Sequence, residues 1–216
     1  MYYSDKGIVL RHRDINEADR IVTIFSYEYG RIEVNFKSVK KSKAKLRALS
    51  ELFVYGDYRF YLKKYGAMPL CIGGSVISAY PDIREELEKI ILLSTASDMV
   101  ISLTPLYQKS VEKFFLILNS LNYISTIKKV SKWFFPVFIL NLLEHYGTGF
   151  KNTNVGYNSE FWEMIHKPDY SSIAYLNKYD DLYLEVMDFA ISKISENTNK
   201  KYFLDFIGSA EVGSVH

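Results

Sequence analysis

Residues 31–37 read Arg-Ile-Glu-Val-Asn-Phe-Lys, with an apolar side chain at every second position. This two-residue period is typical of a β-strand that has one buried and one solvent-facing side. Similar short apolar runs lie on both sides of it along the chain. The first 80 residues therefore predict five strands, at residues 7–10, 20–26, 31–37, 52–62 and 70–78.

The connections between these runs indicate how the strands follow one another. Residues 27–30, Tyr-Glu-Tyr-Gly, have the length of a hairpin loop, and Gly30 suits a positive φ at its end. Residues 42–50 are rich in alanine, leucine and basic side chains, which favour a short helix or helical turn. The order of three strands, a short helix and two strands predicts a small closed barrel of the OB-fold type.

The period of the sequence changes at Pro81, where apolar residues begin to recur at helical spacing. Four apolar stripes follow, which start at Ile83, Val111, Phe135 and Leu182. We therefore expect an α+β chain, with a five-stranded OB-fold barrel at 1–80 and an all-helical domain at 81–216. Residues 147–158 are rich in glycine and asparagine and predict a loop, and the end after Phe206 is expected to fray.

Composition excludes several classes of protein. The 216 residues are 48% hydrophobic, which suits a folded protein and not an intrinsically disordered one. A single cysteine, Cys71, can neither form an intramolecular disulfide nor assemble a cysteine-based zinc site, so we expect a reducing compartment and no metal. No signal peptide and no membrane span are evident, which predicts a cytoplasmic protein without membrane contact.

Charge is distributed unevenly between the two predicted halves. Residues 1–80 hold 14 basic and 8 acidic side chains, whereas residues 81–216 hold 13 basic and 17 acidic ones. A basic half beside an acidic half indicates an anionic partner, such as nucleic acid, for the basic half.

The densest basic run is residues 37–47, with six basic side chains and no acidic one. It follows the predicted third strand, beside the face that OB barrels use for oligonucleotides. Such a run can neutralise phosphates without reading sequence, although a solvated loop without a ligand is the alternative. Nearby aromatic residues offer stacking surfaces if exposed, and core packing is expected for at least half of them: Phe36, Tyr55, Tyr58 and Tyr61.

Residues for catalysis are not evident in the sequence. The four histidines lack partners at metal-ligand spacing, and Gly73-Gly74 lacks the lysine and further glycines of a phosphate-binding loop. Cys71 lies in an apolar strand and predicts an inert core thiol. We therefore expect neither an enzyme nor a cofactor.

Three stretches in family order resemble the RecO family of DNA repair and recombination mediators: residues 6–10, Lys-Gly-Ile-Val-Leu; residues 17–26, Glu-Ala-Asp-Arg-Ile-Val-Thr-Ile-Phe-Ser; and residues 29–32, Tyr-Gly-Arg-Ile. Residues 138–147 resemble the family's helix that precedes its insertion. The resemblance implies an OB-fold followed by a helical domain, binding of single- and double-stranded DNA, and annealing of complementary strands. It also implies partnership with RecR, contact with the C-terminal tail of single-strand-binding protein, and indirect help in loading RecA.

The resemblance also implies roles for particular residues. The six basic residues of 37–47 would hold phosphates, with Arg31 and Arg59 as flanking contacts; the six are Lys37, Lys40, Lys41, Lys43, Lys45 and Arg47. Arg20 is expected to be structural, in a charged pair with Glu17 or Asp19. The acidic tail of single-strand-binding protein is expected on the helical half, where one dense basic-aromatic cluster occurs; the alternative is a solvated helix start over buried aromatics. The cluster comprises Lys128, Lys129, Lys132, Trp133 and Phe134.

The chain departs from the family at one place. Many members carry a four-cysteine zinc insertion after the helix at 138–147, and residues 147–158 contain no cysteine here. We therefore expect this loop to replace the insertion, without zinc. Two other readings stay open: an OB-fold protein that acts on RNA, and a scaffold that binds through its acidic helical half.

Overall fold

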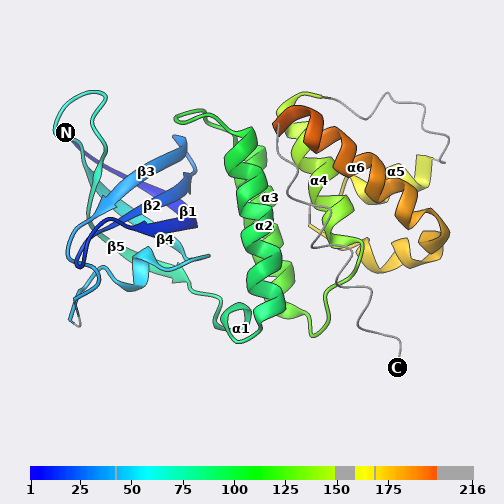
Figure 1. The fold of residues 1–216 in the computed structure, drawn as a ribbon, viewed down its shortest axis with the longest axis horizontal. Helices are drawn as coiled ribbons and strands as arrows, with labels where there is room; N and C mark the ends of the chain where they lie inside the picture. The colour runs from blue at the N-terminus through cyan, green and yellow to red at the C-terminus, as the bar shows by residue number, and fades with distance from the viewer. Residues whose placement is uncertain (42, 149–158, 168, 199–216) are drawn as a thin grey trace.

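The computed structural model describes residues 1–216 except 42, 149–158, 168 and 199–216. A β-barrel forms one end of the molecule and helices form the other (Figure 1). The predicted loop at 147–158 lies outside the described residues from residue 149 onward, and so does the end that is predicted to fray after Phe206.

Five strands close into a barrel in the order β1-β2-β3-β5-β4, with β1 paired to both β2 and β4. The β3–β5 pair is parallel and the other pairs are antiparallel. This OB-like order confirms the predicted fold class. The strands are β1 Tyr2–Asp14, β2 Arg20–Ser26, β3 Gly30–Phe36, β4 Tyr55–Tyr61 and β5 Leu70–Ser78.

The first strand is much longer than the predicted 7–10. Its first half pairs with β4 and its second half with β2, and the register shifts between Val9 and Arg11. A β-bulge bends a strand in this way, so one strand serves two neighbours. The outer parts of β1 were not predicted because exposed polar side chains interrupt the apolar pattern there.

The connection from β3 to β4 contains less helix than predicted at 42–50. Successive turns that end at Ala44 and Arg47 lead into a short 3₁₀ helix, η1, at Ala48–Ser50. Lysines and an arginine at 41, 43, 45 and 47 would form like-charged pairs four residues apart in an α-helix, which disfavours it.

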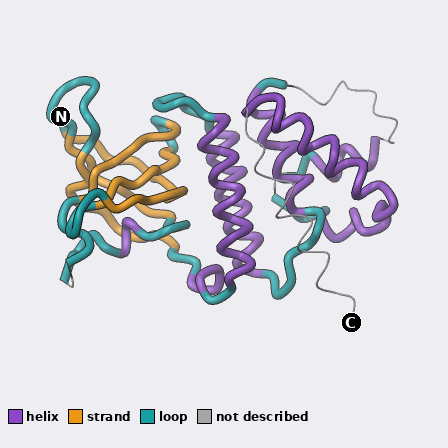
Figure 2. The backbone as a smooth tube through the Cα atoms, viewed as in Figure 1, coloured by secondary structure: helices purple, strands orange, loops and turns teal. Residues whose placement is uncertain are grey.

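Helices follow the barrel along the chain (Figure 2). The strands end at Ser78, and the first helix begins at Pro81, where the predicted change of period lies. The elements are α1 Pro81–Arg84, α2 Leu87–Leu103, α3 Val111–Thr126, α4 Phe134–Tyr146, α5 Ser159–Ile165, the 3₁₀ helix η2 Ile173–Leu182 and α6 Tyr183–Thr198. Among the described helices, none is long and apolar enough to cross a membrane.

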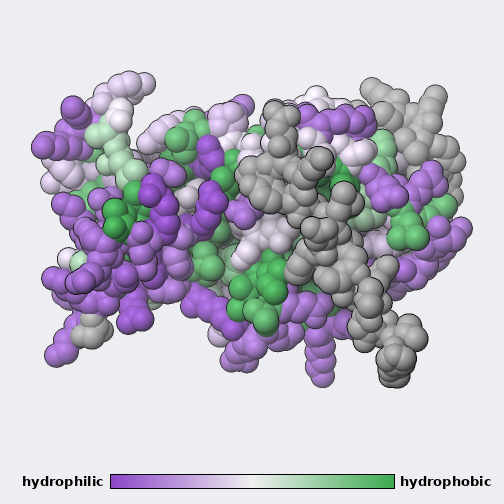
Figure 3. Space-filling model, in the orientation of Figure 1, coloured by the Kyte–Doolittle hydropathy of each residue, from purple (hydrophilic) through white to green (hydrophobic). Residues whose placement is uncertain are grey.

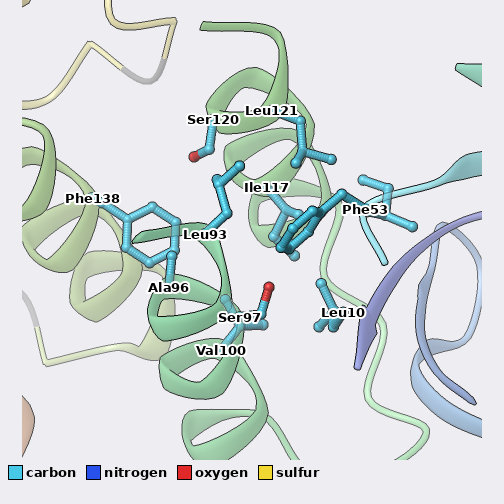
Figure 4. Close-up of a pocket in the computed structure, with 11 residues that line it drawn as sticks. Leu10, Phe53, Leu93, Ala96, Ser97, Val100, Ile117, Ser120, Leu121 and Phe138 are labelled. Carbon is cyan, nitrogen blue, oxygen red and sulfur yellow. The ribbon is translucent and has the colours of Figure 1, made fainter. Parts of the chain in front are cut away.

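Barrel and helices share a hydrophobic core. Ile8, Leu10, Phe25 and Phe53 of the barrel half pack into the same buried cluster as the side chains of α2, α3 and α4. A cavity of about 10 Å³ lies at this joint, lined mainly by apolar side chains (Figure 4). A space of that size holds about one water molecule, so it is a packing defect and not a ligand site.

Polar contacts surround the joint. Arg31 donates a hydrogen bond from Nη1 to the Ile101 carbonyl at 2.7 Å, and its own carbonyl accepts one from the Tyr107 amide at 2.9 Å. Arg11 lies 3.4 Å from Asp98 of α2. These contacts orient the barrel on α2. We call the opposite end of the barrel, which none of the described α-helices covers, its free end (Figure 1).

Candidate nucleic-acid interface

The basic segment, residues 37–47, is anchored at its start by the turn between β1 and β2. The Asn16 side chain accepts hydrogen bonds from the amides of Ala18 and Asp19, at 2.8 and 2.7 Å. Asp19 Oδ1 in turn accepts a hydrogen bond from the Ser38 amide at 2.7 Å, and the Lys40 amide donates to the Ala18 carbonyl. The two loops are therefore joined, and the start of the segment has a fixed position.

Apolar side chains of the β3–β4 connection hold the basic segment against the barrel. Val39 and Leu49 are buried in the barrel core, and Leu46 packs against it. The Tyr58 hydroxyl donates a hydrogen bond to the Leu49 carbonyl at 3.2 Å. The cations between these anchors extend into solvent, and Figure 3 shows hydrophilic side chains gathered over this part of the molecule.

Five of the six basic side chains of the segment are exposed and have no ion pair within the described part of the chain. They can each approach a phosphate without first breaking an ion pair. These five are Lys37, Lys41, Lys43, Lys45 and Arg47.

Lys40 differs from the other five. Its ammonium lies 2.9 Å from Asp14 and donates a hydrogen bond to the Asn16 carbonyl at 3.3 Å. The hydrogen bond from Lys40 is the main cause that lowers the pKa of Asp14, and Arg20 adds to it. The structure thus gives Lys40 an anchoring contact, and the sequence could not distinguish it from its neighbours.

Arg20 is structural, as expected, but its predicted partners were wrong. It contacts Asp14 at 3.1 Å and Glu51 at 3.2 Å, and it donates to Ser50, whereas Glu17 and Asp19 were predicted. The β1–β2 pairing places Asp14 directly opposite Arg20, and the turn at η1 brings Glu51 to the same barrel end.

The two flanking arginines lie in different places. Arg31 is at the start of β3, the end of that strand opposite to Lys37, where it belongs to the joint with α2. Partial burial there lowers the pKa of its guanidinium. Arg59 is exposed on β4 and lies against Gly73 of β5. The structure does not bring Arg31 together with the basic segment.

Of the four aromatic residues that could stack on bases, two lie in the barrel core. Phe36 and Tyr58 are fully buried, and Tyr55 and Tyr61 are partly exposed. The buried pair cannot contact a base, which agrees with the expectation that at least half would pack in the core.

The sequence interpretation missed the connection between β4 and β5. Lys63 and Lys64 are exposed there, with no ion pair among the described residues. The Asn35 amide donates a hydrogen bond to the Pro69 carbonyl at 2.9 Å, so this connection lies beside the end of β3 that leads into the basic segment. The sequence feature that could have indicated this basic connection is the absence of any acidic residue from 58 to 81.

The basic-aromatic cluster of the helical half is divided by burial. Trp133 and Phe134 are fully buried, so a peptide on the surface cannot contact their rings. Lys132 is held 3.0 Å from Asp180, and Lys128 and Lys129 are exposed. This arrangement corresponds to the alternative interpretation, a solvated helix start over buried aromatics, and it corrects the inclusion of the two rings in a binding surface.

The described residues contain no group of three or more His, Cys, Asp or Glu side chains that could hold a metal ion. Cys71 is buried in β5, and burial raises the pKa of its thiol to about 11, so the thiol stays protonated and inert at neutral pH.

Comparison with known proteins gives matches over both halves. Residues 1–80 match the family described as Recombination protein O N terminal. A DNA repair protein RecO from Clostridium acetobutylicum is 27% identical over 180 residues, 80% of this chain and 68% of that protein. The one from Halalkalibacterium halodurans is 29% identical over 125 residues, 58% of this chain and 48% of that protein.

A third relative, the DNA repair protein RecO of Pelotomaculum thermopropionicum, is 32% identical over 123 residues, 57% of this chain and 47% of that protein. The match thus spans about half the length of two of these three relatives. The family's N-terminal domain coincides with the barrel, and the longest of the three matches extends well into the helices. The chain is therefore similar to DNA repair proteins of the RecO family, and its barrel matches the family's N-terminal domain.

Proposed function

We propose that this chain binds DNA through the basic segment and acts, without catalysis of its own, as a mediator of DNA repair and recombination. In this proposal, residues 1–80 are the nucleic-acid-binding domain. One observation carries it: exposed cations without ion pairs, on a loop anchored at the free end of an OB-like barrel. The relatives, which are DNA repair proteins, support the biological role.

Contacts of this kind act on the phosphate backbone. Lysine and arginine side chains that replace condensed counterions bind single and double strands of any sequence. By reducing the repulsion between two backbones, the same cations would favour annealing of complementary strands. Annealing therefore belongs to the proposal as a consequence of charge neutralisation.

Partners of the RecO family complete the proposal. The likeness to RecO proteins supports work with RecR, contact with single-strand-binding protein and indirect loading of RecA. Lys128 and Lys129, the exposed cations that precede α4, are the proposed contacts for an acidic tail. This surface does not include the buried Trp133 and Phe134.

The test is a fluorescence-anisotropy titration of labelled DNA at several salt concentrations. Replacement of Lys41, Lys43 and Lys45 with alanine should weaken binding to all sequences alike. It should reduce the slope of log K against log salt by about 2, at about 0.7 per lost contact with a single strand. Exposed loop substitutions change stability by at most about 0.5 kcal/mol, so the melting temperature should stay nearly constant.

A matched control replaces Lys128 and Lys129, which are also exposed but lie in the helical half. This variant should bind DNA like the wild type. Unchanged affinity and slope in the folded triple variant would contradict the proposal. Competition with RNA of the same sequence tests the alternative of an RNA-binding protein, which predicts that RNA displaces the DNA more effectively than unlabelled DNA does.

A further inference from the structure

We infer that the connection between β4 and β5 stacks an aromatic ring on an unpaired base of the strand that the basic segment holds. The inference rests on the proposed function and adds a preference for single strands to it. Its main observation is Tyr65, whose side chain is 100% exposed between β4 and β5. We call residues 62–69 the tyrosine hairpin.

A tight turn presents the ring. The Ala67 amide donates a hydrogen bond to the Lys64 carbonyl at 3.1 Å, which makes Tyr65 and Gly66 the two central residues of a β-turn. Gly66 has φ +78°, as the third position of a type II turn requires. Tyr65 therefore lies at the tip of the hairpin, where its ring packs against none of the barrel's core side chains.

Charge around the ring favours a polyanion. Lys63 and Lys64 precede Tyr65 and are exposed, and no acidic residue occurs from 58 to 81. An aromatic ring beside two cations is the combination that single-strand-binding surfaces use, since the cations hold phosphates while bases of any kind stack on the ring.

A second aromatic surface continues from the tip to the base of the hairpin. The Tyr61 ring lies 5.0 Å from the Tyr2 ring, and Tyr2 is 73% exposed. Tyr61 is the last residue of β4 and Tyr2 the first of β1, so both rings are fixed by the barrel ladder. A strand that stacks on Tyr65 can extend toward this pair.

The hairpin and the basic segment lie at the same end of the barrel. The Asn35–Leu70 pair joins the start of β5 to the end of β3, and Lys37 follows directly after that end. In Figure 1 both connections lie on the side of the barrel remote from the helices, with the hairpin at the top of that side and the basic segment at the bottom. A single strand that runs along this side could contact both, with phosphates on the segment and a base on Tyr65. A duplex keeps its bases stacked inside and gains little from the ring.

The experiment compares Tyr65→Ala and Tyr65→Phe in the full chain with three probes: oligodeoxythymidine, an abasic strand of equal length, and a duplex. Loss of one stacked base should raise the Kd of Tyr65→Ala for oligodeoxythymidine by about 5- to 150-fold. Binding to the abasic strand and the duplex should not change, and neither should the salt slope. Tyr65→Phe keeps the ring and should bind like the wild type.

Tyr175→Ala is the control, because Tyr175 is 68% exposed in the helical half. It should leave all three affinities unchanged. If Tyr65→Ala binds oligodeoxythymidine with the same Kd as the wild type, the inference is wrong. It is also wrong if Tyr65→Ala raises the Kd for the oligodeoxythymidine and the abasic strand by the same factor. If Tyr65→Ala binds like the wild type while the Lys41, Lys43 and Lys45 variant loses affinity for DNA, the inference is wrong and the proposed function is retained. If Tyr65→Ala loses affinity and the lysine variant does not, base stacking is supported and the proposed role of the basic segment is wrong.

Discussion

Arg20 joins three parts of the barrel end through one guanidinium. It contacts Asp14 on β1, and it reaches Ser50 and Glu51 at the end of η1. Its side chain is only 13% exposed, so little water is available to replace these contacts. The loop that carries the basic segment therefore depends on this side chain for its position.

Replacement of Arg20 with alanine should lower the free energy of unfolding by about 1–3 kcal/mol, because partly buried acceptors lose their charged donor. Arg20→Lys should recover only part of the loss, since an ammonium lacks the planar fork of donors. Urea denaturation measures both effects. Arg13→Ala, which replaces an exposed arginine on the neighbouring strand β1, is the control, and an equal effect of the two alanine variants would contradict the structural role of Arg20.

Acid should loosen the same loop. The Ser38 amide is the main cause that lowers the pKa of Asp19, and Lys40 is the main cause for Asp14. Groups with a lowered pKa bind fewer protons in the folded chain, so their contribution is complete above the unfolded value of about 3.9 and is lost as pH falls through the folded pKa. An Asp14→Asn, Asp19→Asn variant should therefore lose less stability between pH 5 and pH 3 than the wild type, as measured by urea denaturation at each pH. Parallel curves would contradict the assignment.

For single residues, the sequence predicted which side chains are exposed or structural better than it predicted which residues they contact. The composition of residues 37–47 was enough to predict an exposed basic segment. It could not show that Lys40 pairs with Asp14, because that contact exists only after β1 and β2 have paired. Tyr65 and its lysines were missed because a basic pair is weak evidence of binding until its exposure is known.

Gly30 lies where the β2–β3 hairpin meets the α2–α3 connection. It has φ +66° at the end of the β2–β3 hairpin, as the sequence predicted. A Cβ on Gly30 would lie 1.8 Å from the Gln108 carbonyl oxygen of the α2–α3 connection. The hairpin can approach the helices this closely only with glycine at this position.

Gly30→Ala should lower the free energy of unfolding by more than about 2 kcal/mol, since overpacking adds to backbone strain. Gly66→Ala is the matched control, with φ +78° and no atom within 4 Å of the added Cβ. It should cost only the strain of a left-handed residue, about 1–2 kcal/mol. Thermal melting of both variants checks the difference. Equal losses would mean that the close contact at Gln108 relaxes freely.

The sequence predicted the bounds of a helix or strand well where a single hydrophobic period extends over the whole element. The alternating burial of β3 follows the alternation of its sequence, and its bounds were predicted to within one residue at each end. In β1 the two halves pair with different strands and carry exposed polar side chains, so its pattern showed only the middle. The short helix or helical turn predicted at 42–50 is confined to the 3₁₀ helix at Ala48–Ser50, because helix propensity takes no account of the repulsion between basic side chains four residues apart, as at Lys43 and Arg47.

The whole molecule has one continuous core across the joint. Phe53 belongs to the barrel half but lies 2% exposed in the cluster formed with the helices. Ile8 and Leu10 of β1 join it there. Period-2 patterning showed that such residues are buried, but it could not show that they pack on helices instead of inside the barrel.

A shared core predicts one cooperative unfolding transition. Phe53→Ala should cost about 3–5 kcal/mol, as large-to-small substitutions of buried aromatics do. Both tryptophans, Trp133 and Trp162, lie in the helical half, so their fluorescence reports a barrel substitution only if the halves are coupled. We expect the fluorescence and circular dichroism transitions in urea to shift together. A fluorescence transition that stays at the wild-type midpoint would contradict the coupling.

We propose that nucleic acid binds at the free end of the barrel. Chemical acetylation of surface lysines, with and without a saturating single-stranded oligonucleotide and followed by mass spectrometry, tests it directly on the unmodified chain. We expect unchanged reactivity of Lys128 and Lys129 and protection of the barrel lysines, which are Lys37, Lys41, Lys43, Lys45, Lys63 and Lys64. Protection of Lys128 and Lys129 while the barrel lysines stay reactive would contradict it.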